Sequence, residues 1–326
     1  MTSSTPITRL RARLPFVLAL AVLAAACPRT PPDDEPGGPR KVARGGADEA
    51  IPVPGACELG FVRMGLVPQG GAGDVPAQFA PLETWLGSQL GARVELTAYS
   101  DYDQLISDVV SGELDVAQLP PLAFVLARER DPALLLLATQ IASGGVHYAS
   151  YLMVRRDSEV QRVRDLEHKR LAFVSPSSAS GFVYPVARLL QDDVDVRAVM
   201  KHAVFTGSHY ASVKAVLEGT LDAAATYSGG LALSRDTGLD TRDLRVLGIT
   251  AAIPQEALVA HSHLPTQHVR CLQRAFLLTN KSSAPGRAAL ARFAAQDGWT
   301  VTSEAFYDQA REQLQAVRSA LPEVAP

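Results

Sequence analysis

Short apolar runs alternate with amphipathic segments of helical length along most of this chain, and this alternation limits the folds open to it. In the first half the pattern predicts the strands 59–67, 93–98, 114–119 and 134–139 and the helices 77–90, 102–111 and 121–130. A second round predicts the strands 148–155, 171–174, 203–205, 221–226 and 244–249 and the helices 181–191, 208–217 and 231–235. After Pro265 the pattern predicts helices alone, at 266–278, 285–295 and 303–321.

Such alternation is typical of right-handed βαβ units, so we expect an α/β protein with a mostly parallel sheet in each of two lobes. No long linker separates the two rounds, which favours a ligand cleft between the lobes at the carboxyl ends of their strands. We expect the first lobe to contain residues 54–150 and about 250–326, and the second lobe to contain residues 151–249.

The first 26 residues are typical of an export signal. Arg9, Arg11 and Arg13 precede an apolar run, 14–26, that is too short to span a bilayer and ends in three alanines before Cys27. This ending is typical of a bacterial lipobox, in which Cys27 is lipid-modified and becomes the first mature residue. A plain signal peptide followed by an incidental cysteine is the alternative.

The next segment, 27–53, is rich in proline, glycine and charge and predicts a disordered tether. The chain has 31 Lys and Arg against 34 Asp and Glu, a formal net charge of -3 at pH 7. Removal of the predicted signal takes away three arginines and no acid, which makes the mature chain more acidic. A mildly acidic exported domain is a poor candidate for binding nucleic acid.

Two cysteines, Cys57 and Cys271, lie in the predicted folded part, in a compartment where disulfides persist. They form a disulfide or remain two separate thiols, and the sequence leaves both possibilities open. His261 and His263 have a spacing that suits a metal only on a strand, and no third ligand is nearby, which favours exposed loop histidines. We expect no metal and no cofactor.

A serine-rich turn, 175–181, lies between a predicted strand and a predicted helix and ends in Gly181. The first N–H groups of a helix have no intrahelical partner, its dipole favours negative charge, and serine hydroxyls add donors. The turn therefore predicts an anion site, with simple capping of the helix as the alternative.

Four stretches together resemble the substrate-binding lipoproteins of phosphate, phosphite and phosphonate ABC importers. They are Tyr99-Ser100-Asp101-Tyr102 with Gly112-Glu113-Leu114-Asp115, the run 148–158, the serine turn with Pro185, and Phe205-Thr206-Gly207-Ser208-His209 with Leu221-Asp222-Ala223. The resemblance covers roughly 61–253 and implies a two-lobed periplasmic-binding-protein fold (type II) that closes by hinge motion around a small anion. It implies no enzymatic activity.

The resemblance also implies which residues bind the ligand. They are Tyr102, Tyr148, Ser177, Ser178, Ser180, Gly181, His209 and Glu256. Hydroxyl and imidazole groups of this kind donate hydrogen bonds to an oxyanion.

Three departures from the family pattern affect the expected ligand. Ala179 occupies a position where the family usually has threonine, and Gly229 occupies one where aminophosphonate binders have a glutamate. Glu256 stands where an aspartate is common. The loss of one of two amine-facing carboxylates favours phosphate, phosphite or a simple alkylphosphonate over an aminoalkylphosphonate.

The resemblance further implies an ABC permease as partner, a monomer, and attachment to the membrane through lipid on the extracytoplasmic side, which is the periplasm in a Gram-negative bacterium. A sensor lipoprotein of the same fold, presenting a different small anion to a signalling receptor, is an alternative. A serine hydrolase using Ser178 or Ser180 with His209 is a remote one, because no Gly-x-Ser-x-Gly elbow surrounds either serine.

Overall fold

The computed structural model describes residues 57, 59–68, 75–293 and 295–326. The predicted signal peptide, Cys27 and almost all of the predicted tether lie outside these residues. Within the described part of the chain, no helix is long and apolar enough to cross a membrane.

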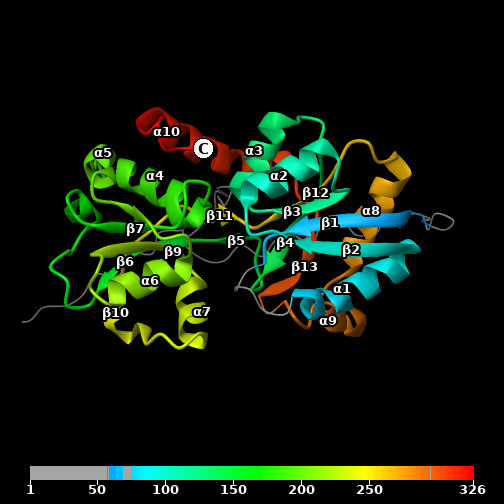
Figure 1. Ribbon diagram of the computed structural model, residues 1–326, viewed down its shortest axis with the longest axis horizontal. Helices are drawn as coiled ribbons and strands as arrows, with labels where there is room; N and C mark the ends of the chain where they lie inside the picture. Colours follow the sequence, from blue (N-terminus) through cyan, green and yellow to red (C-terminus); the bar gives the residue numbers. More distant parts are fainter. Residues whose placement is uncertain (1–56, 58, 69–74, 294) are drawn as a thin grey trace, which may run out of the picture. The chain divides into compact units, whose positions relative to one another are not determined.

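A six-stranded sheet forms the first lobe, with strand order β13-β4-β12-β3-β1-β2 (Figure 1). Its strands are β1 (Gly60–Leu66), β2 (Ala92–Ala98), β3 (Val116–Leu119), β4 (Leu135–Ala142), β12 (Ala257–Ala260) and β13 (Gln296–Thr300). The helices of this lobe are α1 (Val75–Leu90), α2 (Tyr102–Ser111), α3 (Pro121–Arg130), α8 (Thr266–Leu278) and α9 (Ala284–Ala289).

A five-stranded sheet forms the second lobe, with strand order β10-β6-β9-β7-β8. Its strands are β6 (Ser150–Arg155), β7 (Leu171–Phe173), β8 (Val204–Phe205), β9 (Ala223–Tyr227) and β10 (Leu244–Ile249). Its helical segments are η1 (Val163–Leu166), the π-helix η2 (Ala179–Val183), α4 (Tyr184–Gln191), α5 (Val196–Met200), α6 (His209–Leu217), α7 (Gly230–Asp236) and η3 (Thr241–Asp243).

Both sheets are mixed, which corrects the prediction of a mostly parallel sheet in each lobe. The parallel pairs are β1 with β2 and β3, and β7 with β8 and β9. The remaining pairs are antiparallel. They involve strands that lie next to the points where the chain passes between the lobes: β12 pairs with β3 and β4, and β6 pairs with β9 and β10. Only the strands that follow one another through βαβ units, β1 to β3 in the first lobe and β7 to β9 in the second, follow the parallel rule.

The chain passes between the sheets at a short antiparallel pair, β5 (His147–Tyr148) and β11 (Ile253–Pro254). Tyr148 lies opposite Ile253 in this pair. The predicted strand 148–155 is therefore two strands, β5 and β6, that belong to different sheets.

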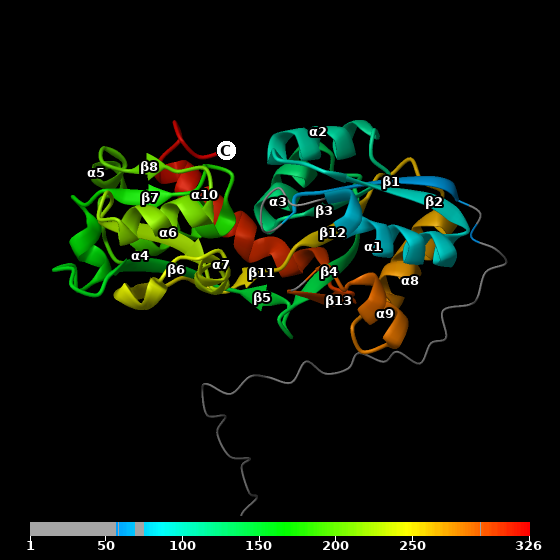
Figure 2. The same ribbon diagram turned by 60° about the horizontal axis from the view of Figure 1, so that its bottom comes forward.

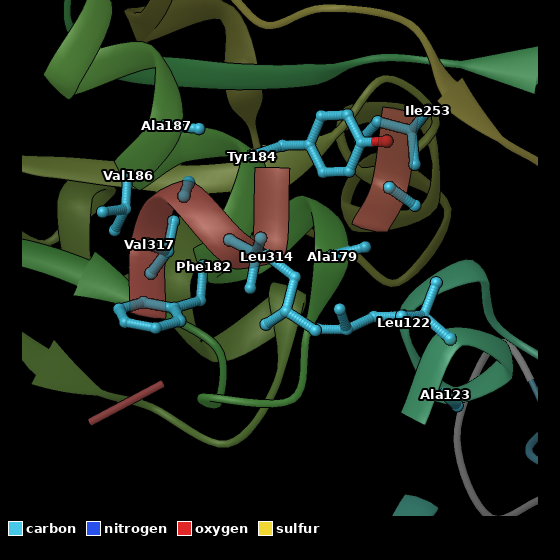
Figure 3. Packing of buried hydrophobic residues seen from close by; sticks show 14 of the residues in the cluster. Leu122, Ala123, Ala179, Phe182, Tyr184, Val186, Ala187, Ile253, Leu314 and Val317 are labelled. Carbon is cyan, nitrogen blue, oxygen red and sulfur yellow. The ribbon is translucent and has the colours of Figure 1, made fainter. Parts of the chain in front are cut away.

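One buried apolar cluster contains residues of both lobes and of the C-terminal helix α10 (Asp308–Ala320), which follows η4 (Glu304–Tyr307). Figure 3 shows Leu314 and Val317 of α10 close to Phe182, Ala179 and, farther on, Leu122 of α3. Helix α10 also packs against α4 and β11. Because it contacts elements of both lobes, α10 stabilises the region where they join.

Separate clusters cover the other face of each sheet. In the second lobe, Val213 and Val216 of α6 pack on Met153, Ala172 and Ala224, while α4 covers the opposite face (Figure 2). In the first lobe, α1, α8 and α9 bury the second face of the sheet.

The two lobes share a structural repeat that the sequence pattern alone did not reveal. Arg63 and Asp115 form an ion pair, Arg170 and Asp222 form another, and the partners are 52 residues apart in both cases. In each pair the aspartate also accepts the backbone N–H of its arginine, at 2.8 Å. Tyr102 opens α2 in the first lobe and His209 opens α6 at the corresponding place in the second.

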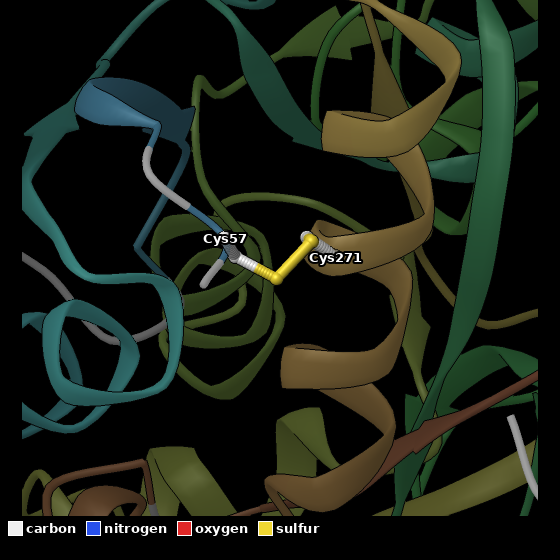
Figure 4. Close-up of a disulfide and its surroundings, with 2 residues drawn as sticks. All are labelled: Cys57 and Cys271. Atoms are coloured by element: carbon white, nitrogen blue, oxygen red, sulfur yellow. A yellow bond between two sulfur atoms is a disulfide. The ribbon is translucent and has the colours of Figure 1, made fainter. Parts of the chain in front are cut away.

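Cys57 and Cys271 form a disulfide, with Cα atoms 6.0 Å apart, which selects one of the two possibilities that the sequence left open (Figure 4). The bond joins the chain just before β1 to helix α8 across 214 residues of sequence. Both ends lie in the first lobe.

The prediction that only helices follow Pro265 is wrong at β13, which pairs with β4 as an edge strand. Gln296, Asp297 and Gly298 resemble a turn, and the register of this strand shifts between Gln296 and Gly298, so its pattern lacks regular alternation. Strands β11 and β12 and helix α5 were also not predicted.

Candidate functional site

The serine turn leads from β7 directly into the π-helix η2, which continues as α4. Ser178 is the N-cap of η2, and its Oγ accepts a hydrogen bond from the N–H of Gly181 at 2.9 Å. Ser178 and Ser180 are buried, with 7% and 4% of their surface exposed, while Ser177 is partly buried. The sequence predicted a helix from Gly181; the helical turn begins two residues earlier because Ser178 caps it.

This geometry separates the roles of the loop N–H groups. The N–H of Gly181 is already bonded to Ser178, whereas the N–H groups of Ala179 and Ser180 belong to the first turn and have no acceptor inside the helix. A side chain at position 181 would place its Cβ 2.5 Å from Val174, so the close approach of the loop to β7 requires glycine there.

A chain of hydrogen bonds connects five polar residues around this loop. The side chains of Tyr148 and Ser180 are hydrogen-bonded. The Ser150 hydroxyl lies 2.6 Å from the Ser180 carbonyl oxygen and 3.1 Å from that of Thr226. The Thr226 hydroxyl in turn lies 3.1 Å from Nδ1 of His209. The structure thus brings Tyr148, Ser180 and His209 into one network.

His209 is the first residue of α6, where Ser208 caps the helix. Its ring packs edge-on against Tyr227, with centroids 4.9 Å apart. Burial lowers the pKa of His209 to about 4, so the imidazole is neutral at pH 7 in the absence of ligand. A neutral imidazole can donate one hydrogen bond, and a bound anion would favour the charged form.

Tyr102 and Glu256 form the first-lobe part of the candidate site. Burial, with a smaller effect of the Glu256 charge, raises the pKa of Tyr102 to about 12. Burial also raises the pKa of Tyr148, and electrostatic interactions with Glu256 and Tyr102 raise the same pKa further. The two phenols and the carboxylate therefore lie within electrostatic range of one another, and both phenols remain neutral donors near neutral pH.

The Glu256 carboxylate is held by a residue of the neighbouring strand. Glu256 precedes β12, which pairs with β3, and Nε2 of Gln118 on β3 donates to Oε2 of Glu256 at 2.5 Å. Glu256 and Gln118 are 6% and 5% exposed.

Sequence reasoning missed Ser150, Thr226 and Gln118. Each is a polar residue at the end of an otherwise apolar buried strand, and each is buried in the structure. A lone hydroxyl or amide at the carboxyl end of such a strand is the signal that would have identified Gln118 and Thr226, because the carboxyl ends of parallel strands face the ligand in open α/β sheets.

The serine-hydrolase geometry is not formed. Ser178 Oγ accepts a hydrogen bond from the backbone N–H of Gly181. Within the described part of the chain, the His209 ring is hydrogen-bonded to Thr226 rather than to either serine. No group of three His, Cys, Asp or Glu residues suited to a metal occurs in the described part of the chain.

Two α/β sheets joined by paired crossing strands, with hydroxyl and imidazole groups gathered beside the crossing, define a two-lobed binding protein of the periplasmic type. Residues 64–307 match the family described as ABC transporter, phosphonate, periplasmic substrate-binding protein. The chain belongs to this family, as the resemblance predicted. Its members are transporter binding proteins and not enzymes, which removes the hydrolase alternative.

Curated relatives differ in the ligand that their names carry. The phosphate-import protein PhnD of Mycolicibacterium smegmatis is 29% identical over 56% of this chain and 59% of its own length. The phosphonates-binding periplasmic protein of Escherichia coli is 24% identical over 62% of this chain and 61% of its own length. A probable phosphite-binding protein of Prochlorococcus marinus is 25% identical over 50% of this chain and 57% of its own length. The chain thus matches about three fifths of the length of these relatives.

Solved structures share the fold. PhnD1 of Prochlorococcus marinus in complex with methylphosphonate has a TM-score of 0.67 at 20% identity, covering 79% of this chain and 98% of the other. A binding protein component of a phosphonate ABC transporter from Pseudomonas aeruginosa has a TM-score of 0.68 at 20% identity, covering 81% of this chain and 88% of the other.

Proposed function

We propose that this protein is an extracytoplasmic solute-binding lipoprotein of an ABC importer and that it binds phosphate, phosphite or a simple alkylphosphonate. The observation that carries the proposal is the contact between Tyr148 and Ser180. It links the phenols near Glu256 to the network of the serine turn and His209. The names of the curated relatives support the same class of ligand.

The anion would be bound by donors from both sides. On the second-lobe side we assign the hydroxyls of Ser177, Ser178 and Ser180, which the helical first turn supplements with backbone N–H groups. Since Gly181 donates its N–H to Ser178, we assign Gly181 the role of allowing the close turn. On the first-lobe side we assign the hydroxyls of Tyr102 and Tyr148.

We place the His209 ring proton on Nε2, with Nδ1 accepting a hydrogen bond from the Thr226 hydroxyl. In this tautomer Nε2 is free to donate to an anion oxygen, and Thr226 fixes the ring orientation. Loss of Thr226 would leave the partly buried ring without that restraint.

Closure would be the signal that the ligand is bound. We propose that the ligand first contacts the serine turn and His209 and that hinge motion at the β5–β11 crossing completes the site with the tyrosines. A permease that prefers the closed state would accept only the loaded protein. Cys27 would carry the lipid that anchors the protein to a membrane of the cell envelope on the extracytoplasmic side, which is the periplasm in a Gram-negative bacterium.

A thermal-shift panel tests the ligand class. A ligand that binds only the folded state stabilises it by RT ln(1 + [L]/Kd), so millimolar ligand reveals even weak binding. We expect a rise in Tm with phosphate, phosphite or methylphosphonate, and little or none with 2-aminoethylphosphonate, sulfate and citrate. If only citrate raised the Tm, or if none of the phosphorus oxyanions did, the proposal would be contradicted and the sensor alternative favoured.

A further inference from the structure

Tyr227 is the last residue of β9, the strand that lies between β6 and β7 in the second-lobe sheet. Strand β9 runs parallel to β7, so Tyr227 and the serine turn leave the sheet at the same edge. The carboxyl ends of parallel strands face the ligand in open α/β sheets. Tyr227 therefore lies at the edge of the sheet where we have placed the ligand, although the sequence motifs did not single it out.

The ring of Tyr227 is held by its neighbours. It packs edge-on against His209, with ring centroids 4.9 Å apart. It also lies against Gly229 and Gly230: a Cβ at position 229 would be 2.6 Å from Cε2 of the ring, and a Cβ at position 230 would be 3.3 Å from Cδ1. A side chain at position 229 is thus incompatible with this position of the ring. The glycine pair makes room for the ring, and the ring is fixed beside His209.

This ring borders the donor that we assign to the ligand. Thr226 is hydrogen-bonded to Nδ1 of His209, which leaves Nε2 of the same imidazole for the anion. Burial raises the pKa of Tyr227, so its phenol is neutral at pH 7. The segment 226–230 contains no charged residue. An uncharged ring in a fixed position therefore forms one wall of the space beside the anion.

We propose that Tyr227 is a specificity-determining residue whose ring limits the size of the group on phosphorus, so that the site rejects phosphonates with longer alkyl chains. This inference rests on the proposed function. The contact between Tyr148 and Ser180 restricts the space on the first-lobe side. A well-packed site gives way only partly to extra methylene groups. A propyl group would have to displace a ring that His209 and the glycine pair hold in place.

Calorimetric titration at pH 7 with methyl-, ethyl-, propyl- and butylphosphonate tests this inference. These ligands present the same anionic group, so their Kd values differ mainly through the alkyl chain. We expect Kd of the wild type to rise by about tenfold or more from methyl- to propylphosphonate. Equal Kd values along the series, or tighter binding of butylphosphonate, would overturn the inference while leaving the proposed function intact. Failure to bind any phosphorus oxyanion would overturn the proposed function itself.

Variants separate the size of the ring from general stability, because a less stable site would change Kd for all four phosphonates by a similar factor. In Tyr227→Ala the ratio of Kd for propyl- to methylphosphonate should approach unity. Tyr227→Phe keeps the ring and should keep the wild-type ratio. Tyr210→Ala, which removes a tyrosine of α6 that is 39% exposed, should keep it too.

The same variants decide the case of a wild type that binds phosphate or phosphite but none of the phosphonates. Tyr227→Ala should then gain binding of methylphosphonate, because the space beside the anion is larger. A Tyr227→Ala protein that keeps the wild-type ratio, or that gains no binding in this case, would contradict the role of Tyr227.

Discussion

His209 shows how burial changes the chemistry of a single residue. Its ring is held between Thr226 and Tyr227 at the start of α6, and desolvation lowers its pKa to about 4 from 6.5. The imidazole is therefore neutral before the ligand arrives, and it can donate an N–H to the incoming anion. The negative charge of the bound anion then favours protonation of the ring.

The lowered pKa predicts a pH-dependent stability. Between pH 6.5 and 4 the unfolded chain binds a proton at His209 that the folded protein does not, so the free energy of unfolding falls as the pH drops. His209→Gln should remove this component, which amounts to at most about 3 kcal/mol. Urea denaturation of the wild type and of His209→Gln at pH 7 and pH 4.5 measures this component. The titration of carboxylates changes the stability of both proteins equally, so it cancels when the two pH-dependent losses are compared. Equal losses in the two proteins would contradict the lowered pKa.

Ser178 has two roles that one pair of variants can separate. It caps η2 through the N–H of Gly181, and Ser283 caps α9 in the same way through the N–H of Gly286. Ser178→Ala and Ser283→Ala should each lower stability by about 1 kcal/mol. Only Ser178→Ala should also weaken ligand binding, by about 1–3 kcal/mol, because charged oxygens lose a donor. Calorimetric titration measures the affinities, and equal affinities in the two variants would exclude Ser178 from the site.

At the scale of elements, some bounds could be predicted and others could not. Helices α2 and α3 match their predicted ranges because their ends carry clear signals: Asp101 caps α2, Gly112 ends it in a left-handed conformation, and Pro121 opens α3. Edge strand β13 lacks such signals. Strand β12 is a short run of buried residues whose pairing depends on β3 and β4, which are far away in sequence.

The candidate site shows the same division. The sequence predicted Tyr148, Ser180 and His209 through local motifs, and the structure places them in one hydrogen-bonded network. Gln118 could not be predicted as a partner of Glu256, because the two residues are 138 apart along the chain and meet only through strand pairing.

The disulfide joins the segment before β1 to α8, two parts of the first lobe that are distant in sequence. A cross-link that closes a loop of 214 residues restricts the unfolded chain strongly. The double variant Cys57→Ser/Cys271→Ser should therefore lose about 2–5 kcal/mol of stability. Urea denaturation measures the loss. A reducing agent should destabilise the wild type and leave the double variant unchanged, and a response of both proteins would point to another cause.

At the scale of the whole folded unit, the repeated ion pairs show that both lobes are built on one plan. Equivalent turns in the two lobes are held by equivalent ion pairs, Arg63 with Asp115 and Arg170 with Asp222. Tyr102 and His209 likewise occupy equivalent positions at the first turn of a helix. A shared apolar cluster and helix α10 join the lobes next to the crossing strands. An anion bound between two such first turns would receive donors from both lobes.

The central claim is that this protein binds a small phosphorus oxyanion, and a calorimetric titration at pH 7 tests it most directly. Phosphate, phosphite and methylphosphonate would each be titrated into the purified protein, with sulfate as the comparison. The account predicts saturable binding of at least one phosphorus oxyanion at one site per chain, and binding that is weaker by about 1–3 kcal/mol in His209→Ala. Binding of sulfate in preference to every phosphorus oxyanion, or no saturable heat with any of the four, would contradict it.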